Sequence, residues 1–340
     1  MKTKLFFKNT IILMLIAILF SSCEKSVLDE PSKTKKDVFE SFWTGIDERY
    51  SYFELKNIDW DAVHEQYSTV ITEEMSNEAF FDTLSVLIDL LRDGHSGIKS
   101  PFNLHKNVGF YTRGPENVNE RLIVDNYSKG WGMVKGSLHH FPLREGQVAY
   151  VYYGSFEEPV TDEDIDYIIS KYKDTKGLII DIRNNTGGAA DNIFKLVKRF
   201  INTETYLFSS RFKNGPDHED YTELNKTIVS PAQTTYKGKV CVLTNRKVYS
   251  AASIFTLAMR EVPSVTIVGD TTGGGLGLPV GFELPNEWQV HCAGSQTFSV
   301  NGDNFELGVP PDVQIDMKKE DMDNGIDSII EKAIEIILGE

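Results

Sequence analysis

The spacing of apolar residues predicts helices near both ends of the chain. Apolar side chains recur at three- and four-residue steps over residues 37–46 and 77–91, the spacing of one face of a helix. A shorter helix is expected after Asp59, which can cap free N–H groups. The apolar stripe over residues 325–338 predicts a C-terminal helix.

From residue 147 onward, strand patterns and helix patterns alternate. Apolar runs predict strands, and amphipathic segments between them predict helices at 164–172, 191–201 and 250–260. The expected strands cover 147–153, 177–182, 239–243 and 265–268, followed by a hairpin within 280–298. This rhythm implies a mostly parallel sheet with helices on its faces, an α/β fold.

The same pattern predicts how the chain is divided. We expect an N-terminal helical subdomain over residues 37–97, carrying His95, and an α/β core over 147–320. Residues 98–146 are weakly patterned and predict an irregular, partly β linking region, and residues 321–340 hold the last helix.

The first 36 residues are typical of a targeting segment rather than of a fold. Residues 1–22 combine three lysines with an apolar run too short to span a bilayer, as in a secretory signal peptide. Small residues directly before Cys23 resemble the lipobox of bacterial lipoproteins, which implies acylation of Cys23 and a polar tether over 23–36. The resemblance implies a lipid-anchored protein of the bacterial cell envelope, at the outer membrane or facing the periplasm. The alternative is an ordinary signal peptide with an incidental cysteine.

Composition narrows the classes of function. The formal net charge of −15 disfavours nucleic acid as a partner. Beyond Cys23 only Cys241 and Cys292 remain, and we expect two buried free thiols rather than a disulfide. Histidine and cysteine spacings typical of zinc sites are absent from the sequence, so neither a metal nor a cofactor is expected.

Ser250 is the first candidate for chemistry. It follows a predicted buried strand and opens a helix. Serine is a preferred N-cap, and on local features alone a capping role is favoured. The same position also suits a nucleophile, because the helix dipole and the free N–H groups there, including that of Ala251, stabilise negative charge.

Two glycine-rich turns are the next candidates. Gly187 and Gly188 end the run Asp181-Ile182-Arg183-Asn184-Asn185-Thr186-Gly187-Gly188, and their backbone could approach a ligand closely, although a plain strand-to-helix turn explains them equally. The segment 269–277 could be a simple flexible loop. The expected motifs for phosphate loops and dinucleotide binding are missing from both turns, so nucleotide binding is excluded.

His95 and Glu306 are weaker candidates when taken singly. His95 stands between Gly94 and Gly97 after a rigid helix, although a lone histidine is more often structural. Glu306 precedes a Gly and Pro turn, where a carboxylate is usually a solvated surface group.

Taken together and in this order, these motifs resemble the C-terminal-processing peptidase family. The resemblance rests on the run 181–188, Ser250-Ala251-Ala252, Gly269 with Thr272, and Glu306 with Gly308-Val309 and Pro311-Asp312. It covers roughly residues 37–315 and implies a crotonase- or Clp-protease-like spiral of βα units. The stretch between His95 and Gln147 is too short for an inserted PDZ domain with its connections.

Two branches of that family differ in the base. One uses a lysine after the serine, but the matching loop here is Thr272-Gly273-Gly274-Gly275. The other resembles the core domain of tricorn protease and takes a histidine from an Asp-x-His segment, which Asp93-Gly94-His95 matches. The chain is therefore identified as a member of the tricorn-like branch.

The resemblance implies acyl transfer to a peptide or protein substrate. Ser250 would be the nucleophile, His95 the base, and the N–H groups of Ala251 and of Gly188 or Gly187 the oxyanion hole. Glu306 matches the glutamate that orients the histidine in the tricorn enzyme through a serine beside it. Here Gly94 precedes His95 and Ser96 follows, which leaves open whether Glu306 acts directly, through Ser96 or through water.

Two alternatives come from other classes of function. The chain could bind peptides or hydrophobic ligands after losing turnover, as the retinoid-binding relatives of the same branch suggest. A crotonase-type acyl-CoA enzyme is suggested by the fold alone. Tyr111, Trp131 and Phe141 are candidate walls of a substrate groove, or else core residues.

Overall fold

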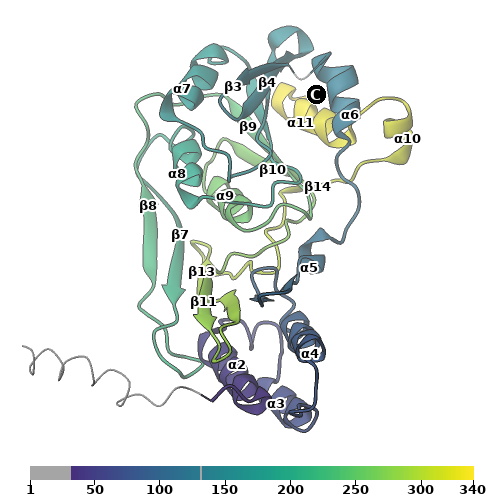
Figure 1. The fold of residues 1–340 in the computed structure, drawn as a ribbon. Coiled ribbons are helices and arrows are strands. Elements are labelled where there is room, and N and C mark those ends of the chain that lie inside the picture. The colour runs from purple at the N-terminus through teal and green to yellow at the C-terminus, as the bar shows by residue number, and fades with distance from the viewer. Residues whose placement is uncertain (1–31, 131) are drawn as a thin grey trace, which may run out of the picture.

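The computed structural model describes residues 32–130 and 132–340 (Figure 1). The predicted signal peptide, Cys23 and most of the predicted tether lie outside the described residues, as does Trp131. Three helices come first in the described chain: α2 (Lys35–Arg49), α3 (Trp60–Ser68) and α4 (Asn77–Leu90). Each begins after a side chain that accepts a backbone N–H, from Thr34, Asp59 and Ser76 respectively, so the sequence itself sets their starts.

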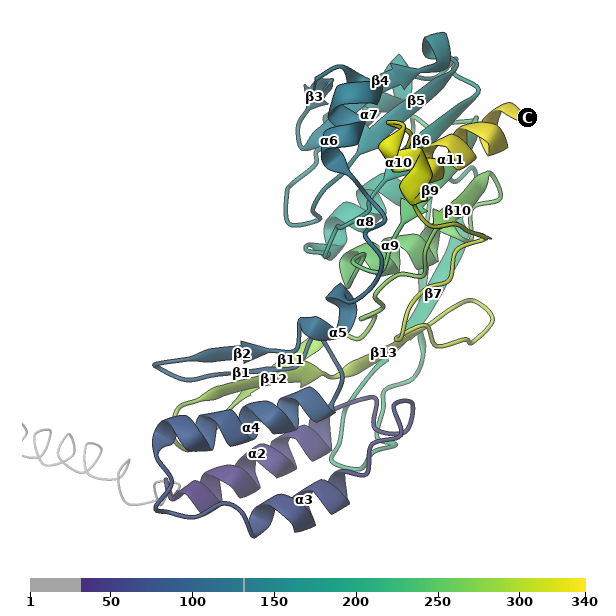
Figure 2. The same cartoon turned by 90° about the vertical axis from the view of Figure 1, so that its right-hand side faces the viewer.

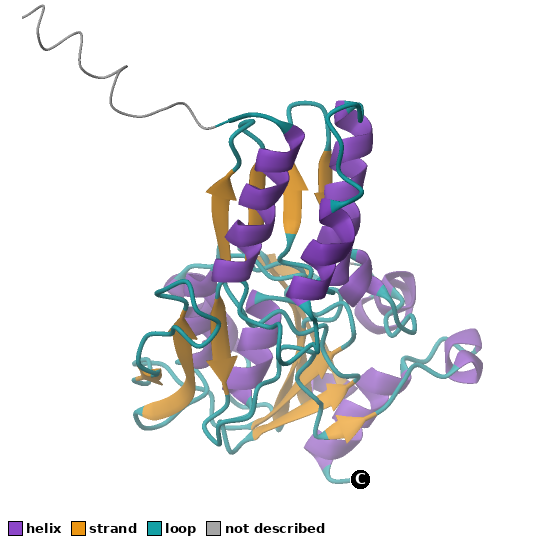
Figure 3. Cartoon of the chain, turned by 90° about the horizontal axis from the view of Figure 1, so that it is seen from below, coloured by secondary structure: helices purple, strands orange, loops and turns teal. Residues whose placement is uncertain are grey.

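The N-terminal helices pack on a small antiparallel sheet built from distant segments (Figures 2 and 3). Its core joins aromatic and aliphatic side chains of α2 and α4, such as Phe42 and Leu84, to Val290 of the sheet. The predicted hairpin at 280–298 therefore pairs with the segment that follows His95. The strand order is β11 (Pro279–Glu283), β12 (Gln289–Ala293), β1 (Gly97–Lys99) and β2 (Leu104–Lys106).

A larger sheet forms the other half of the molecule. Its strands run parallel from β5 to the β14 edge, and β4 and β3 add antiparallel strands at the opposite edge. The order is β14 (Val313–Gln314), β10 (Val265–Gly269), β9 (Lys239–Thr244), β6 (Gly177–Asp181), β5 (Val148–Tyr152), β4 (Leu138–Leu143) and β3 (Met133–Lys135).

Helices cover both faces of this sheet (Figure 1). Alternate strand residues explain the two layers: Ile180 and Val242 face one core, whereas Ile179 and Cys241 face the other. The first core is closed by α7 (Asp162–Lys171), α8 (Ala190–Val197) and α9 (Ala251–Met259), and the second by α11 (Ser328–Leu338). The predicted α/β fold class is confirmed.

A third sheet was not predicted. Strand β13 (Ser295–Phe298) continues from β12 and pairs with β7 (Thr205–Phe212), which pairs in turn with β8 (Asn225–Val229). This sheet links the two halves of the molecule. Short helical turns complete the chain: α5 (Gly109–Thr112), α6 (Glu120–Leu122), the π-helical turn Ile123–Ser128, the 3₁₀ turn Arg144–Gly146 and α10 (Lys319–Asp323).

A buried ion cluster fixes the end of β6. The Arg183 guanidinium is fully buried, donates to both carboxylate oxygens of Asp181, and lies 3.0 Å from a carboxylate oxygen of Asp327 at the start of α11. It also donates to the carbonyl of Asn117. A buried charge needs such partners, so this arginine holds the strand that leads into the glycine turn at 187–188.

Candidate active site

Ser250 opens α9 in a backbone conformation that is unusual for a side chain other than glycine. Its φ and ψ are 55° and −125°, and its hydroxyl makes no capping hydrogen bond. The capping alternative therefore does not describe this side chain. A strained serine at a strand-to-helix turn is the arrangement that exposes a nucleophile.

His95 reaches this hydroxyl from the other half of the molecule. Its Nε2 lies 2.9 Å from the Oγ of Ser250. The histidine sits in the turn between α4 and β1, where a Cβ on Gly94 would come within 2.6 Å of the Tyr111 ring and 2.9 Å of the Tyr249 hydroxyl. Glycine therefore lets the turn approach Ser250 closely.

The environment of His95 favours the neutral imidazole. Burial lowers the pKa of His95, the Asp93 carboxylate opposes that shift, and Lys56 reinforces it. A neutral ring at neutral pH can accept a proton through Nε2. Asp93 also accepts the backbone N–H of His95 at 2.8 Å, which fixes the turn.

Behind His95 lies a buried cluster of two carboxylates and one ammonium. Lys56 is 1% exposed at its side chain, and its Nζ lies 3.0 Å from Asp93 and 3.7 Å from Glu306. The Tyr50 hydroxyl donates to Asp93 and accepts from Lys56. Burial would raise the pKa of Asp93, but Lys56, followed by His95, brings it below its ordinary value. Sequence reasoning missed Lys56, because a single loop lysine normally indicates a solvated residue.

Glu306 holds the glycine loop that borders the site. Its carboxylate accepts the N–H groups of Leu276 and Gly277 at 2.7 and 3.0 Å. Its carbonyl accepts the N–H of Gly275, and the Gly274 carbonyl accepts the N–H of Ser250. Burial and then the neighbouring Asp93 raise the pKa of Glu306 to about 7, against the opposing effect of Lys56.

Of the three routes left open from Glu306 to His95, the one through Ser96 is not formed by hydrogen bonds among the described residues. The Ser96 hydroxyl is buried and has no hydrogen-bond partner among the described residues, and Nδ1 of His95 likewise has none. The Gly277 backbone nevertheless lies near enough to the ring to favour its protonated form. The Glu306 carboxylate therefore contacts the backbone of the loop beside His95.

Two backbone N–H groups beside Ser250 remain available. Within the described chain, neither Gly188 nor Ala251 donates its N–H to another group. Gly187, the other predicted donor, gives its N–H to the side chain of Asn185. A Cβ on Gly187 would lie 2.8 Å from the Ser250 Cβ and 2.9 Å from the Ala251 nitrogen, so this glycine lets the two turns meet.

The sequence and the fold both match known peptidases. The sequence profile of peptidase family S41 matches residues 147–315, and that of the tricorn protease C1 domain matches residues 31–89. A solved structure of a Parabacteroides merdae protein is 34% identical, covers 90% of this chain and 98% of its own, and superposes with a TM-score of 0.86. This chain belongs to peptidase family S41.

More distant members show how far the likeness extends. The carboxy-terminal processing protease CtpA of Bacillus subtilis is 28% identical over 133 residues, which are 39% of this chain and 27% of CtpA. The tricorn protease structure covers 90% of this chain and 37% of its own, at 13% identity and a TM-score of 0.58, which shows a shared fold. The S41 chain thus spans about a quarter of the length of CtpA. The predicted membership of the C-terminal-processing peptidase family is confirmed.

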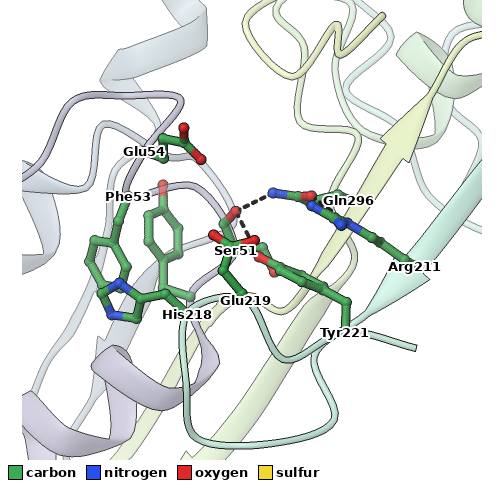
Figure 4. A pocket seen from close by; sticks show the side chains of 9 residues that line it. Ser51, Phe53, Glu54, Arg211, His218, Glu219, Tyr221 and Gln296 are labelled. Atoms are coloured by element: carbon green, nitrogen blue, oxygen red, sulfur yellow. Dashed lines mark hydrogen bonds between the residues drawn. The ribbon is translucent and has the colours of Figure 1, made fainter. Parts of the chain in front are cut away.

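A separate cavity of about 240 Å³ lies between the N-terminal subdomain of this S41 chain and the third sheet (Figure 4). The carbonyl of Ser51 accepts hydrogen bonds there from Gln296 and from the Tyr221 hydroxyl, at 2.6 and 3.2 Å. Neither Ser250 nor His95 lines this cavity. This cavity is therefore distinct from the site formed by Ser250 and His95.

Other predicted features fall in different places. Tyr111 stacks on Tyr249 with 3.9 Å between ring centres, beside the site, whereas Phe141 packs on Tyr150 in the core, where both rings line a separate cavity. Cys241 and Cys292 are buried free thiols. Within residues 32–130 and 132–340, no group of three metal-binding side chains occurs, and no helix has the length and apolar character of a membrane span.

Proposed function

We propose that this S41 chain hydrolyses peptide bonds through an acyl-enzyme on Ser250, as an endopeptidase or a carboxy-terminal processing peptidase. The observation that carries the proposal is the distance of 2.9 Å between the Ser250 Oγ and the His95 Nε2, at a serine held in a strained turn. A hydroxyl beside a neutral imidazole is activated as it attacks, because the ring takes its proton.

This geometry supports a reaction in two stages, acylation of Ser250 and then hydrolysis of the acyl-enzyme. The Ser250 oxygen attacks the peptide carbonyl carbon while its proton passes to His95. The oxyanion that forms accepts hydrogen bonds from the N–H groups of Gly188 and Ala251. Collapse breaks the C–N bond, and His95 returns the proton to the departing amine. Water then attacks the ester and gives a proton to His95, which passes it to the departing Ser250 oxygen as the C–O bond to the acyl product breaks.

The buried cluster behind His95 favours the charged intermediate states. Asp93 and Glu306 share the single ammonium of Lys56, so with both carboxylates ionised the cluster carries a net negative charge. The imidazolium that forms at His95 supplies a balancing positive charge next to Asp93. Asp93 is thus a positioning residue that stabilises the protonated histidine, whereas Lys56 opposes that protonation and holds Asp93 and Glu306 together in the cluster.

Product analysis tests the proposal. Wild-type chain and Ser250→Ala would each be incubated with a mixture of unfolded proteins, and new peptide termini identified by mass spectrometry. We expect termini that appear with wild type, are absent with Ser250→Ala and are reduced about 10²-fold or more with His95→Ala. Equal product patterns for wild type and Ser250→Ala would overturn the assignment.

The same experiment addresses the alternative of a binding protein without turnover. Tight binding of peptides or hydrophobic ligands by folded wild type, with no cleavage under any condition, would favour that alternative. The close serine–histidine contact favours turnover, because a binding role does not require it.

We also propose that Cys23 is lipidated and anchors the protein in the bacterial cell envelope. The support comes from the sequence, in the charged and apolar segment before Cys23. Full-length wild type expressed in a bacterium should partition into the detergent phase after extraction, and Cys23→Ser should move to the aqueous phase. Identical partitioning of the two would contradict the anchor.

A further inference from the structure

An open cleft is lined by Arg92, three residues before His95, and by Arg246, four residues before Ser250. Two adjoining cavities of about 360 and 340 Å³ share Arg92 and Phe110. The first is also bordered by Lys56 and Arg246, and the second by Arg113. We call the two together the Phe110 cleft.

Cations surround the aromatic ring at the centre of the cleft. The Lys56 Nζ lies 5.5 Å and the Arg246 guanidinium carbon 5.8 Å from the centre of the Phe110 ring. Arg92 is tied to the Lys56 carbonyl through one guanidinium nitrogen. Among the residues that the structure describes, the one acidic side chain that lines the cleft is Asp89, which is 2.9 Å from Nε2 of His105.

The arginines of the cleft lack carboxylate partners. Elsewhere in this acidic chain, Arg183 and Arg199 form ion pairs with carboxylates at 3.0 Å or less. Among the described residues, no carboxylate lies within 4.0 Å of Arg92, Arg113 or Arg246. Unpaired cations gathered on a protein with net charge −15 create a local positive potential that attracts an anion.

Arg246 is held in place while keeping donors to spare. Its Nη1 donates to the carbonyls of Thr272 and Leu307, both at 2.9 Å, and the residue is half-buried. The guanidinium has five N–H donors, so those on Nε and Nη2 remain for a ligand. A carboxylate would accept such donors in a paired geometry.

The cleft is linked to the reaction site by a pair of stacked rings. Phe110 precedes Tyr111, whose ring stacks on that of Tyr249, the residue before Ser250. Arg246 lies on the same segment, four positions before Ser250. A peptide bound at Ser250 could therefore extend to this cleft within a short stretch of extended chain.

We propose that the Phe110 cleft is a subsite for a carboxylate of the peptide substrate, bound by Arg92, Arg113 and Arg246. The carboxylate comes from an acidic side chain or from the C-terminus of the peptide, since both present the same group. This subsite rests on the proposed peptidase function and makes the protein selective for peptides with a negative charge at one fixed distance from the cleaved bond.

Arg113 separates this proposal from a purely structural explanation. Arg92 and Arg246 also hold loops through carbonyl groups, so their loss could disturb the fold. Arg113 is exposed and makes no hydrogen bond or ion pair within the described residues, so its removal should leave the fold unchanged. Arg121, whose side chain is 91% exposed in a surface pair, provides a matched control for loss of one charge.

The test measures binding to full-length Ser250→Ala, which cannot turn its ligand over. The probes are fluorescent pools of ten-residue peptides with randomised neutral residues and Glu or Gln fixed at each position in turn. Each pool is made with a free and with an amidated C-terminus. We expect about three- to tenfold tighter binding for Glu at one position, or for the free C-terminus, as charge-assisted contacts give.

The variants then decide whether the arginines are responsible. Adding Arg113→Gln should abolish the preference for the carboxylate without changing the binding of Gln-containing amidated pools, whereas Arg121→Gln should leave it intact. Arg113→Glu should reverse the preference toward pools with Lys at that position. Equal binding of Glu and Gln pools and of both C-termini, or a preference that survives Arg113→Gln, overturns the proposal.

Failure of the subsite and failure of the proposed function give different results. Cleavage by wild type with no charge preference in binding leaves the peptidase and rejects the subsite. A carboxylate preference that depends on Arg113, in a chain that cleaves nothing, keeps the cleft as a binding site and rejects turnover.

Discussion

The backbone conformation of Ser250 is the feature that best indicates its function. Its positive φ, the missing cap hydrogen bond and the nearby Gly187 distinguish it from an ordinary helix start. The sequence predicted Ser250 and His95 through motifs that match a family. It could not predict Lys56, because burial of a lysine depends on two carboxylates that lie 37 and 250 positions further along the chain.

Gly187→Ala should block the reaction. The new Cβ would lie 2.8 Å from the Ser250 Cβ, in a backbone with φ of 99° that alanine rarely adopts. We expect the rate of peptide cleavage to fall about 10²-fold or more, because the strained turn and the oxyanion donors shift. Gly281→Ala serves as the control, since its Cβ would meet one atom at 3.6 Å, and it should stay within about twofold of wild type. Comparable losses in both variants would contradict this geometry.

Glu306 predicts a pH dependence of stability. Folding raises the pKa of the Glu306 carboxyl from an ordinary 4.5 to about 7. Between pH 4.5 and about pH 7, Glu306 is therefore protonated in the folded state and ionised in the unfolded state. The contribution of Glu306 to stability is therefore fully present below pH 4.5 and is lost as pH rises through about 7.

Glu306→Gln removes this titration and leaves the other groups in place. Melting temperatures measured from pH 5 to pH 8 should fall with pH more steeply in wild type than in Glu306→Gln. A difference between the two proteins that stays constant over this range would show that Glu306 does not titrate there.

At the scale of elements, the βα units were the most predictable part. Strands β6 and β9 are continuous apolar runs, and α11 has one apolar stripe, so their periodicity is unambiguous. Strands β7 and β8 were missed because each mixes polar and apolar residues on a partly exposed sheet, without the alternation that marks a strand.

Lys56 joins three separate elements: the loop after α2, the turn after α4 and the loop around Glu306. Lys56→Met leaves two buried carboxylates without their cation and should lower the free energy of unfolding by about 3–5 kcal/mol. Chemical denaturation measures this loss.

Two further variants show whether charge is the cause. Adding Asp93→Asn and Glu306→Gln to Lys56→Met should restore much of the stability, because no unpaired charge then remains buried. Lys106→Met removes a lysine from an exposed position and should change stability little. A loss in Lys56→Met no larger than that in Lys106→Met would contradict the role of the cluster.

At the scale of the whole molecule, the site exists because two halves meet. Strand β1, directly after His95, pairs with β12, so that Gly97 faces His291 almost two hundred positions later. Ser250 belongs to the parallel sheet, and the glycine loop held by Glu306 lies between the halves in sequence. Local patterns carry no information on such long-range pairing. The sequence therefore predicted which residues meet through its family resemblance, and not through physical reasoning on spacing.

The central claim is that His95 activates Ser250, and covalent labelling with a fluorophosphonate probe tests it most directly. Intact-protein mass spectrometry should show one adduct on the wild type, mapped to Ser250, and none on Ser250→Ala. The labelling rate of His95→Ala should be about 10²-fold or more lower than that of wild type. A folded wild type that is not labelled, or a His95→Ala variant labelled at the wild-type rate, would contradict the account.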